Sequence, residues 1–294
     1  MRGELAALMA AFLWAVATVI FGRLGKSLTP LALNLAKGAI ALVLLAATLA
    51  VLGQSRVGLD PQAVGILALS GVIGIGLGDT AYFAAVNRLG PRQALLLETL
   101  APPLAALMAL VFLQEALTPW AWLGMALTLA GVGWVIAEGG PGATSADPID
   151  YRGIAFGVLA ALGQATGAVL ARAVLADTAV APLWSAVLRL AGGFVVILGL
   201  LRFQGPVVAQ LRPLKSPRLL VGVALAAVLG TYLAIYLQQT ALKYAATGVA
   251  QALTSTSPLF VLPLALALGE RVSPRAVMGA VVALVGVGIL VNGG

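Results

Sequence analysis

Residues 99–133 read TLAPPLAALMALVFLQEALTPWAWLGMALTLAGVG, and residues 254–288 repeat the pattern as TSTSPLFVLPLALALGERVSPRAVMGAVVALVGVG, at a constant offset of 155 residues and without a gap. Several identical positions are Pro, Gly or Glu residues at segment boundaries, such as Glu115 with Glu270 and Pro119 with Pro274. Two segments that are merely rich in Leu, Ala and Val would not share these residues. The chain therefore contains a duplicated module.

The composition indicates an integral membrane protein. Of the 294 residues, 61% are hydrophobic and 9% are charged, and the mean hydropathy is +1.07. A soluble domain cannot bury that much apolar surface, whereas a lipid bilayer accommodates it. The chain has no cysteine and no histidine, so we expect no metal site, no redox chemistry and no cofactor. The net charge of +7 lies mostly in short loops between apolar runs, which favours a topological signal over nucleic-acid binding.

Ten apolar runs are long enough to cross the bilayer, because ~20 helical residues rising ~1.5 Å each span ~30 Å of hydrocarbon. They lie near residues 4–22, 30–52, 62–86, 92–113, 119–137, 153–175, 182–203, 218–241, 246–268 and 273–291. Lipid offers no partner for an open strand edge, and the runs lack the alternating polarity of a barrel. The predicted fold is therefore all-α, and the third and eighth runs are long enough to bend.

The longest polar stretch, residues 138–152, is predicted to link two halves, 1–137 and 153–294, with five spans each. Since five is an odd number, the second half must enter the membrane from the opposite face, and the repeat is inverted. Inverted repeats are the usual architecture of carriers that open one central site alternately to either side.

The distribution of Lys and Arg predicts the orientation in the inner (plasma) membrane. Loops on the side of the two termini carry four of these residues, and loops on the other side carry eleven. By the positive-inside rule, the Lys- and Arg-rich loops lie in the cytoplasm. Both termini are therefore expected in the periplasm.

With ten runs and an inverted duplication, one motif makes the chain resemble the EamA branch of the drug/metabolite transporter superfamily. The motif is a Pro, then Glu-x-x-(Ser/Thr)-Pro, then Gly, and it occurs at Glu115–Pro119 with Gly124 and at Glu270–Pro274 with Gly279. The resemblance implies a secondary transporter, often an exporter of amino acids or other small metabolites. It also implies a central cavity lined by the first four helices of each half, with the fifth and tenth helices at the periphery.

Four ionisable side chains fall well inside predicted spans: Lys37, Asp79, Glu98 and Arg189. A charge at mid-membrane costs ~2.5–3.5 kcal/mol on insertion scales, so each should face a watery cavity or a partner. Two interpretations stay open. One is a polar binding site for a small-molecule substrate, in which a carboxylate takes up a coupling proton as the site changes exposure. The other is a structural Lys37–Glu98 ion pair that holds the second and fourth helices together.

Further candidates for cavity lining are polar or aromatic residues in the middle parts of the spans: Trp14, Thr18, Tyr82, Gln164, Tyr232, Tyr236 and Gln251. Trp14, Tyr232 and Tyr236 lie deeper than an interfacial aromatic belt, which favours a cavity. Tyr232 and Tyr236 are also i,i+4 neighbours and should share one helix face. The alternative for each aromatic residue is ordinary packing inside the bundle.

Other residues of the repeat are expected to be structural. Glu115 and Glu270 stand between helices and suit a capping or hairpin role. Gly124, Gly131 and Gly133, with their copies, should allow close helix approach.

Two other function classes fit the sequence less well than a transporter. An intramembrane transferase needs a carboxylate cluster for a metal or a nucleophile system, and Asp79 and Glu98 alone lack the spacing of either. A channel or receptor suits an inverted repeat with broken symmetry less well than a carrier does. No GxxxxGK(S/T) loop is present, so a gradient, and not ATP, should drive transport.

Overall fold

The chain is all-helical in the computed structural model, which describes residues 1–24, 28–53, 60–89, 91–138, 150–176, 178–267 and 273–293. Nine segments of this described part are long and apolar enough to cross a membrane. The remaining expected span, the ninth in the chain, consists of two shorter helices, α13 (Thr247–Thr254) and α14 (Ser257–Ala267). The predicted all-α fold is confirmed, and the spans begin and end within three residues of the predicted runs.

The first half forms its five spans from α1 (Arg2–Leu24), α2 (Pro30–Val51), α3 (Pro61–Gly71) with the π-helical segment η2 (Val72–Gly78) and α4 (Asp79–Leu89), α5 (Pro91–Glu98) with α6 (Ala101–Phe112), and α7 (Pro119–Glu138). The second half repeats this order with α8 (Tyr151–Leu175), α9 (Pro182–Phe203), α11 (Pro217–Ala227) with η4 (Val228–Leu233) and α12 (Ala234–Tyr244), α13 with α14, and α15 (Pro274–Gly293). Two short helices, α10 (Val207–Gln210) and η3 (Arg212–Lys215), connect α9 to α11.

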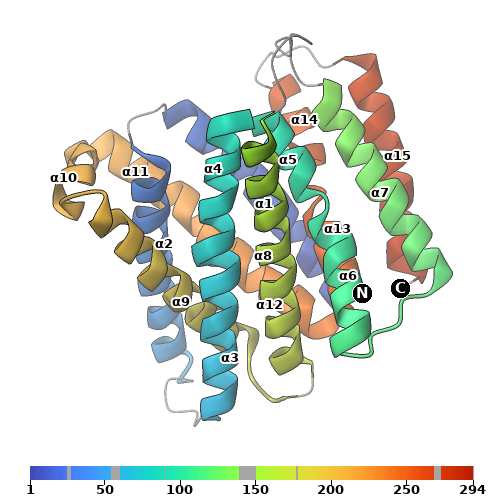
Figure 1. The fold of residues 1–294 in the computed structure, drawn as a ribbon, viewed down its shortest axis with the longest axis horizontal. Coiled ribbons are helices and arrows are strands. Elements are labelled where there is room, and N and C mark those ends of the chain that lie inside the picture. The colour runs from blue at the N-terminus through green and yellow to red at the C-terminus, as the bar shows by residue number, and fades with distance from the viewer. Residues whose placement is uncertain are drawn as a thin grey trace.

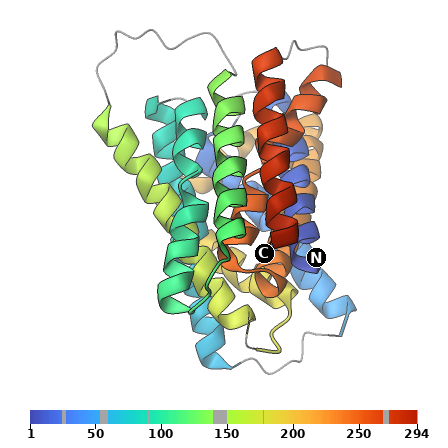
Figure 2. The same cartoon turned by 90° about the vertical axis from the view of Figure 1, so that its right-hand side faces the viewer.

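Both termini lie at the same end of the bundle, which we call the terminal end (Figures 1 and 2). The opposite end, where α7 ends and α8 begins, is the linker end. Most of the predicted linker, residues 139–149, lies outside the described residues.

Proline residues and side-chain caps mark the helix starts. Within the described residues, proline is the first residue of seven helices of the membrane spans, because the first turn needs no N–H from that residue. They are α2, α3, α5, α7, α9, α11 and α15. Asp150 caps α8 by accepting hydrogen bonds from the backbone N–H groups of Arg152 and Gly153, both at 3.0 Å. Arg88 Nη1 also donates to Asp150 at 3.1 Å. The hydrogen bonds from Gly153 and Arg88 stabilise the carboxylate and lower the pKa of Asp150.

Glycines of α7 and α15 pack against each other and relate the two halves. A Cβ on Gly124 would lie 2.9 Å from the Gly286 carbonyl oxygen, and one on Gly131 would lie 2.5 Å from the Gly279 carbonyl oxygen. Gly279 and Gly286 are the repeat copies of Gly124 and Gly131, so each glycine faces the copy of the other. This crosswise pairing requires two antiparallel helices around a two-fold axis, as an inverted repeat predicts.

The third glycine of this group behaves differently. A Cβ on Gly133 would meet only a Leu96 methyl group at 3.4 Å, and one on Gly288 would meet nothing within 4 Å. The expectation of close approach is therefore wrong for this pair. Gly133 and Gly288 lie on faces of α7 and α15 that point away from the contact between them.

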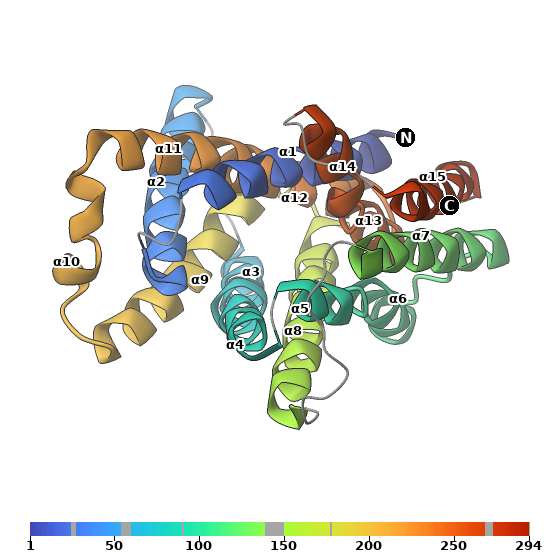
Figure 3. The same cartoon turned by 90° about the horizontal axis from the view of Figure 1, so that it is seen from above.

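The halves are interleaved through their first helices. The helix α1 packs against α11, η4, α12, α13 and α14 of the second half, and α8 packs against α3, η2, α4, α5 and α6 of the first half. Figure 3 shows both exchanges from above, with α7 and α15 side by side at one edge of the bundle. Because each half surrounds a helix of the other, the two halves enclose a shared interior.

Four spans are interrupted near the middle of the membrane, at equivalent places in the two halves. The third and eighth spans contain the π-helical segments η2 and η4. The fourth and ninth spans break at residues 99–100 and 255–256. Discontinuous helices and π-bulges leave backbone groups outside regular α-helical bonding, and in membrane proteins such geometry persists where it lines a cavity or a site.

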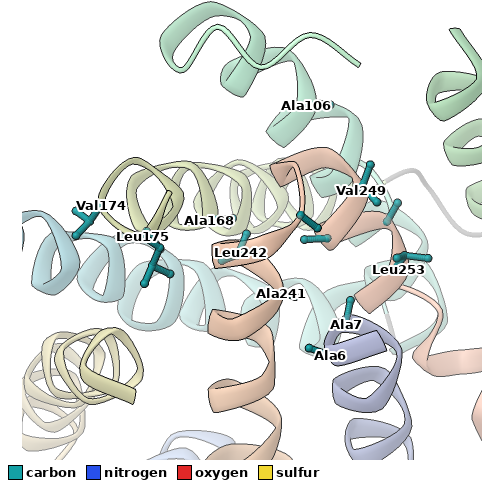
Figure 4. Packing of buried hydrophobic residues seen from close by; sticks show 14 of the residues in the cluster. Ala6, Ala7, Ala106, Ala168, Val174, Leu175, Ala241, Leu242, Val249 and Leu253 are labelled. Carbon is teal, nitrogen blue, oxygen red and sulfur yellow. The ribbon is translucent and has the colours of Figure 1, made fainter. Parts of the chain in front are cut away.

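The largest apolar core lies toward the terminal end and joins both halves (Figure 4). Ala6 and Ala7 of α1 and Ala106 of α6 pack there with residues of α8, α12 and α13, including Leu175 and Leu242. Alanine at these positions allows the helices to approach closely, as small residues do in lipid. The terminal end is therefore tightly packed between the halves.

Candidate functional site

A cavity of about 380 Å³ lies in the middle of the bundle, between the halves. Its lining includes residues from all four interrupted spans, namely Ile75 in η2, Thr99 after α5, Thr231 in η4 and Ser255 after α13. The interruptions thus supply the wall of one cavity. This placement matches the midplane binding sites that transporters form from broken helices.

The cavity is lined by all four ionisable side chains that the sequence places inside the membrane: Lys37, Asp79, Glu98 and Arg189. They come from α2, α4, α5 and α9, which are far apart in the sequence. Two are cationic and two are acidic, so the cavity offers both signs of charge. A role of these residues in binding stays a prediction.

Asp79 is the most connected of the four. It is the first residue of α4, directly after η2, so the π-helical segment sets the direction of its side chain. Its carboxylate accepts hydrogen bonds from Asn34 Nδ2 at 3.4 Å and from Gln164 Nε2 at 3.1 Å. Both Lys37 and Arg189 interact electrostatically with it. Asp79 therefore has two amide donors and two cations as neighbours.

Arg189 is held against the first half by a close helix contact. The residue is 2% exposed, and its Nη1 donates to the Gly167 carbonyl oxygen at 3.0 Å. A Cβ on Gly71 would lie 1.9 Å from the Arg189 carbonyl oxygen, so only glycine fits at that position of α3. The contact between α3 and α9 fixes where the guanidinium enters the cavity wall.

The expected Lys37–Glu98 ion pair is not formed. The ion pairs of the described residues join the N-terminus to Glu4, Arg88 to Asp150 and Arg172 to Glu115. The charge that Lys37 faces is Asp79, and the charge that Glu98 faces is also Asp79. Lys37 lies seven residues after Pro30 and Glu98 six residues after Arg92, so residue counting places both at a similar depth. Depth does not fix the direction in which each helix points its side chain.

Four other predicted site residues line the same cavity. Trp14 of α1 donates from Nε1 to the Gly230 carbonyl oxygen of η4 at 2.8 Å and so binds the π-helical segment to the opposite half. Tyr82, Gln164 and Gln251 also belong to the lining. The cavity lining thus includes residues of α1, α4, α8 and α13.

Three predicted residues lie elsewhere, which corrects the expectation that they line the cavity. Thr18 is exposed and does not line the cavity, although it lies only four residues after Trp14. The Tyr232 hydroxyl shares a 2.8 Å hydrogen bond with Thr48 Oγ1 of α2, and Tyr236 is 37% exposed. Tyr232 lies in η4 and Tyr236 in α12, and the lining residues of this span are Gly230, Thr231, Ile235 and Gln238.

Sequence reasoning missed several polar residues of the lining. Asn34 lies one turn before Lys37 on the same face of α2, a spacing that could have identified it. Gln238 of α12 was not missed, because the sequence places it with the polar residues in the middle of the spans, and it lines the cavity too. Thr254 and Ser255 precede Pro258, and hydroxyl groups at such places can satisfy backbone groups freed by a proline. Both hydroxyls do donate to the Gln251 carbonyl oxygen, at 3.0 and 2.9 Å, yet both residues also line the cavity.

A polar network ties the halves together at the terminal end. Arg172 Nε of α8 donates to Glu115 Oε1, and Thr247 donates to Glu115 Oε2 from its backbone N–H at 2.8 Å and from its hydroxyl at 2.9 Å. Arg172 Nη1 donates in addition to the carbonyl oxygens of Leu242 and Lys243, each at 2.8 Å. We call Glu115, Arg172 and Thr247 the terminal clasp.

The terminal clasp gives the partners behind the structural role expected of Glu115, which accepts a hydrogen bond from the backbone N–H of the first residue of α13 and so caps that helix. Its carboxylate does not cap its own hairpin but joins the connection between α6 and α7 to α8 and to the first residue of α13. The side chains of Arg172 and Glu115 are 16% and 15% exposed, so solvent screens the pair only partly. Gln251, one turn after Thr247, already lines the cavity, so the clasp lies directly beneath it. Glu270, the copy of Glu115, lies outside the described residues.

Comparison with known proteins gives two findings and one negative result. A family model described as the EamA-like transporter family matches the chain twice, at residues 1–137 and 151–292. A solved structure titled "Crystal structure of protein" is similar with a TM-score of 0.80 and 20% sequence identity, over 98% of this chain and 95% of that one. At this identity the likeness shows the fold alone. A search of curated proteins finds no match.

Proposed function

The chain belongs to the EamA-like transporter family, and on this premise we propose that it carries a small polar metabolite, such as an amino acid, across the inner membrane by alternating access. The protein is a transporter of the drug/metabolite superfamily and not an enzyme. Export as the direction follows the resemblance of the sequence to exporters. The halves that would exchange conformations are residues 1–137 and 153–294, joined by 138–152.

The cavity with both signs of charge is the observation that carries this proposal. Lys37 and Arg189 lie around Asp79, while Glu98 stands apart from both cations. The cavity therefore has a region with excess positive charge and a separate carboxylate. A zwitterion, with one carboxylate and one ammonium group, complements such a pair of regions. Trp14, Tyr82, Gln164 and Gln251 would supply the remaining polar and aromatic contacts.

The packing at the terminal end supports alternating access. The terminal clasp and the alanine-rich core close the bundle below the cavity. Lining residues such as Phe83 and Leu95 lie toward the linker end. In an inverted repeat the same contacts can exchange between the two ends, because each half has an equivalent of each helix in the other. We infer that this structure corresponds to the state closed at the terminal end.

Saturable exchange of substrate is the result expected of a carrier. A thermal-shift screen of the purified protein against amino acids, sugars and nucleosides should find a ligand, since binding to the folded state alone raises the apparent melting temperature. In proteoliposomes loaded with that ligand, labelled ligand should accumulate by counterflow and its flux should saturate. Flux that rises linearly with concentration, without counterflow, would indicate a channel and contradict the proposal.

Fusion reporters should place both termini in the periplasm. The eleven Lys and Arg residues in loops at the linker end, against four at the terminal end, favour a cytoplasmic linker end. A C-terminal alkaline phosphatase fusion should be active, and a green fluorescent protein fusion at the same residue should be dark. Fusions in the connection between α9 and α11 serve as the internal control and should give the opposite pattern. A fluorescent C-terminal fusion with a silent phosphatase would reverse the orientation and leave the inverted repeat intact.

A further inference from the structure

We propose that Glu98 is a shared site at which a proton and the amino group of the substrate bind in alternation, so that each substrate moves against one proton. The proposal rests on the transport function above and assigns it a coupling ion. It commits to substrates that carry a protonated amine.

The first observation is that Glu98 has no partner. It is the last residue of α5, at the break of the fourth span, and its side chain lines the cavity. Within the described residues, its carboxylate makes no hydrogen bond and no ion pair. The charged group that acts on it is the carboxylate of Asp79, which has the same sign. Glu98 is thus an uncompensated acid inside the membrane.

The second observation is that the cations of the cavity act on Asp79 and not on Glu98. Lys37 and Arg189 both act on Asp79, and Arg189 also donates to the Gly167 carbonyl oxygen. Among the elements packed against α5, α4 contributes Asp79 and Tyr82 to the cavity. The parts of α7 and α8 that line the cavity contribute no ionisable side chain. No cation of the described protein therefore neutralises Glu98.

These two observations define what Glu98 must bind. An isolated carboxylate in a low-dielectric cavity is costly unless it is protonated or meets a cation. In the empty carrier the partner is a proton. When a substrate ammonium group approaches, the Glu98 carboxylic acid releases that proton to water on the same side of the membrane, and the carboxylate pairs with the ammonium. On the other side the substrate leaves as Glu98 takes up a proton, so one proton and one substrate cross in opposite directions.

The repeat limits the site to one proton per cycle. The copy of Glu98 in the second half is Leu253, which is fully buried, and the copy of Asp79 is Ala234. The carboxylates therefore break the symmetry of the two halves. A carrier with two equivalent acids could bind two protons, whereas this chain offers one uncompensated acid within the described cavity.

Infrared spectroscopy tests the proton site without transport. Difference spectra of the protein in empty proteoliposomes, recorded between about pH 5 and pH 9, where buried carboxyl groups titrate, should show loss of a protonated-carboxyl carbonyl band. Glu98→Gln should abolish this band, and Glu98→Asp should retain it at a shifted position. The control is the double variant Lys37→Met/Asp79→Asn, which removes the other acid of the cavity together with one of its cations and should keep the band. A band that survives in Glu98→Gln, or disappears only in the double variant, would overturn the assignment.

Proton release tests the shared use of the site. In weakly buffered solution, a mixture of the common amino acids should release protons from the wild-type protein in detergent, and a mixture of 2-hydroxy acids with the same side chains should not. Glu98→Gln should lose the release. Equal release by both mixtures, or none by the amino acids, would contradict an amine–proton exchange. If counterflow is observed but no carboxyl band depends on Glu98, the carrier function stands and the assignment of the proton site to Glu98 is wrong. If a band depends on Glu98 but no counterflow is observed, the proton site stands and the carrier function is wrong.

Discussion

Asp79→Asn should abolish counterflow and lower the apparent melting temperature of the protein. Loss of the carboxylate leaves Lys37 and Arg189 in the cavity without the charge that each faces. No ion pair of the described residues is broken, but two buried cations lose the negative charge that acts on them, and an uncompensated buried charge is destabilising. The amide can still accept a hydrogen bond from Asn34 or Gln164, so the polar contacts are kept and the charge is the variable. The measurements are thermal unfolding in detergent and counterflow in proteoliposomes.

Lys37→Met tests whether the effects of Asp79→Asn arise from the unbalanced cation or from a direct role of the Asp79 carboxylate in transport. The single variant should also lower the melting temperature, because it removes one of the two cations around Asp79. The double variant Lys37→Met/Asp79→Asn should lose less stability than the two single losses added together, with a coupling of ~0.5–3 kcal/mol. Transport should stay lost in the double variant. Additive losses of stability would show that the two side chains do not interact, and unchanged counterflow in Asp79→Asn would remove this residue from the binding site.

Much of the fold could be predicted because lipid restricts the choices. In a bilayer every spanning segment must satisfy its own backbone, so apolar length alone locates the helices. Pro119 and Pro274 marked helix starts, and the glycines of the fifth and tenth spans marked a close helix contact. The structure shows in addition which glycine of the other half each of these glycines contacts. A local pattern predicts a helix and its close-contact face, and the partner is fixed by the arrangement of the other helices.

The site was predictable in its depth but not in its pairings. The sequence places Lys37, Asp79 and Glu98 at a similar depth, and the structure puts all three on one cavity. Depth follows from counting residues along a helix. That Lys37 faces Asp79 and not Glu98 depends on helix rotation, which residue counting does not give. Tyr232 shows the same difficulty, because its hydroxyl bonds to Thr48 of α2 instead of lining the cavity.

The structural role of Glu115 was predictable, but its partners were not. Its repeat copy and its place before a proline both favoured a local, structural role. Its partners, Arg172 and Thr247, lie in the other half, more than fifty residues away in the sequence. No periodicity or spacing relates residues at that separation. The signal that was available is the residue type itself, because an acidic side chain near a membrane interface needs donors that its own apolar hairpin cannot supply.

Gly71→Ala should prevent correct packing, while Gly65→Ala on the same helix should be harmless. At Gly71 the new Cβ would lie 1.9 Å from the Arg189 carbonyl oxygen and 2.6 Å from the Arg189 Cα. These are backbone atoms and cannot rotate away, so α3 and α9 must separate. The cost should exceed the ~1–3 kcal/mol typical of an extra methylene in a well-packed core. At Gly65 a Cβ would meet nothing within 4 Å, and alanine in a helix is ~0.5–1 kcal/mol more favourable than glycine.

Each variant adds one methyl group to α3, so a comparison of the two isolates the effect of the α3–α9 contact. Both should be measured for monodisperse yield, melting temperature and counterflow under identical conditions. Gly71→Ala should lose most of the folded protein and all counterflow, because Arg189 is displaced from Gly167 and from the cavity. Gly65→Ala should match or slightly exceed the wild-type melting temperature. If Gly71→Ala melted at the same temperature as Gly65→Ala and still transported, α3 and α9 would not approach as closely as the structure places them, and the position of Arg189 in the site would fall with that contact.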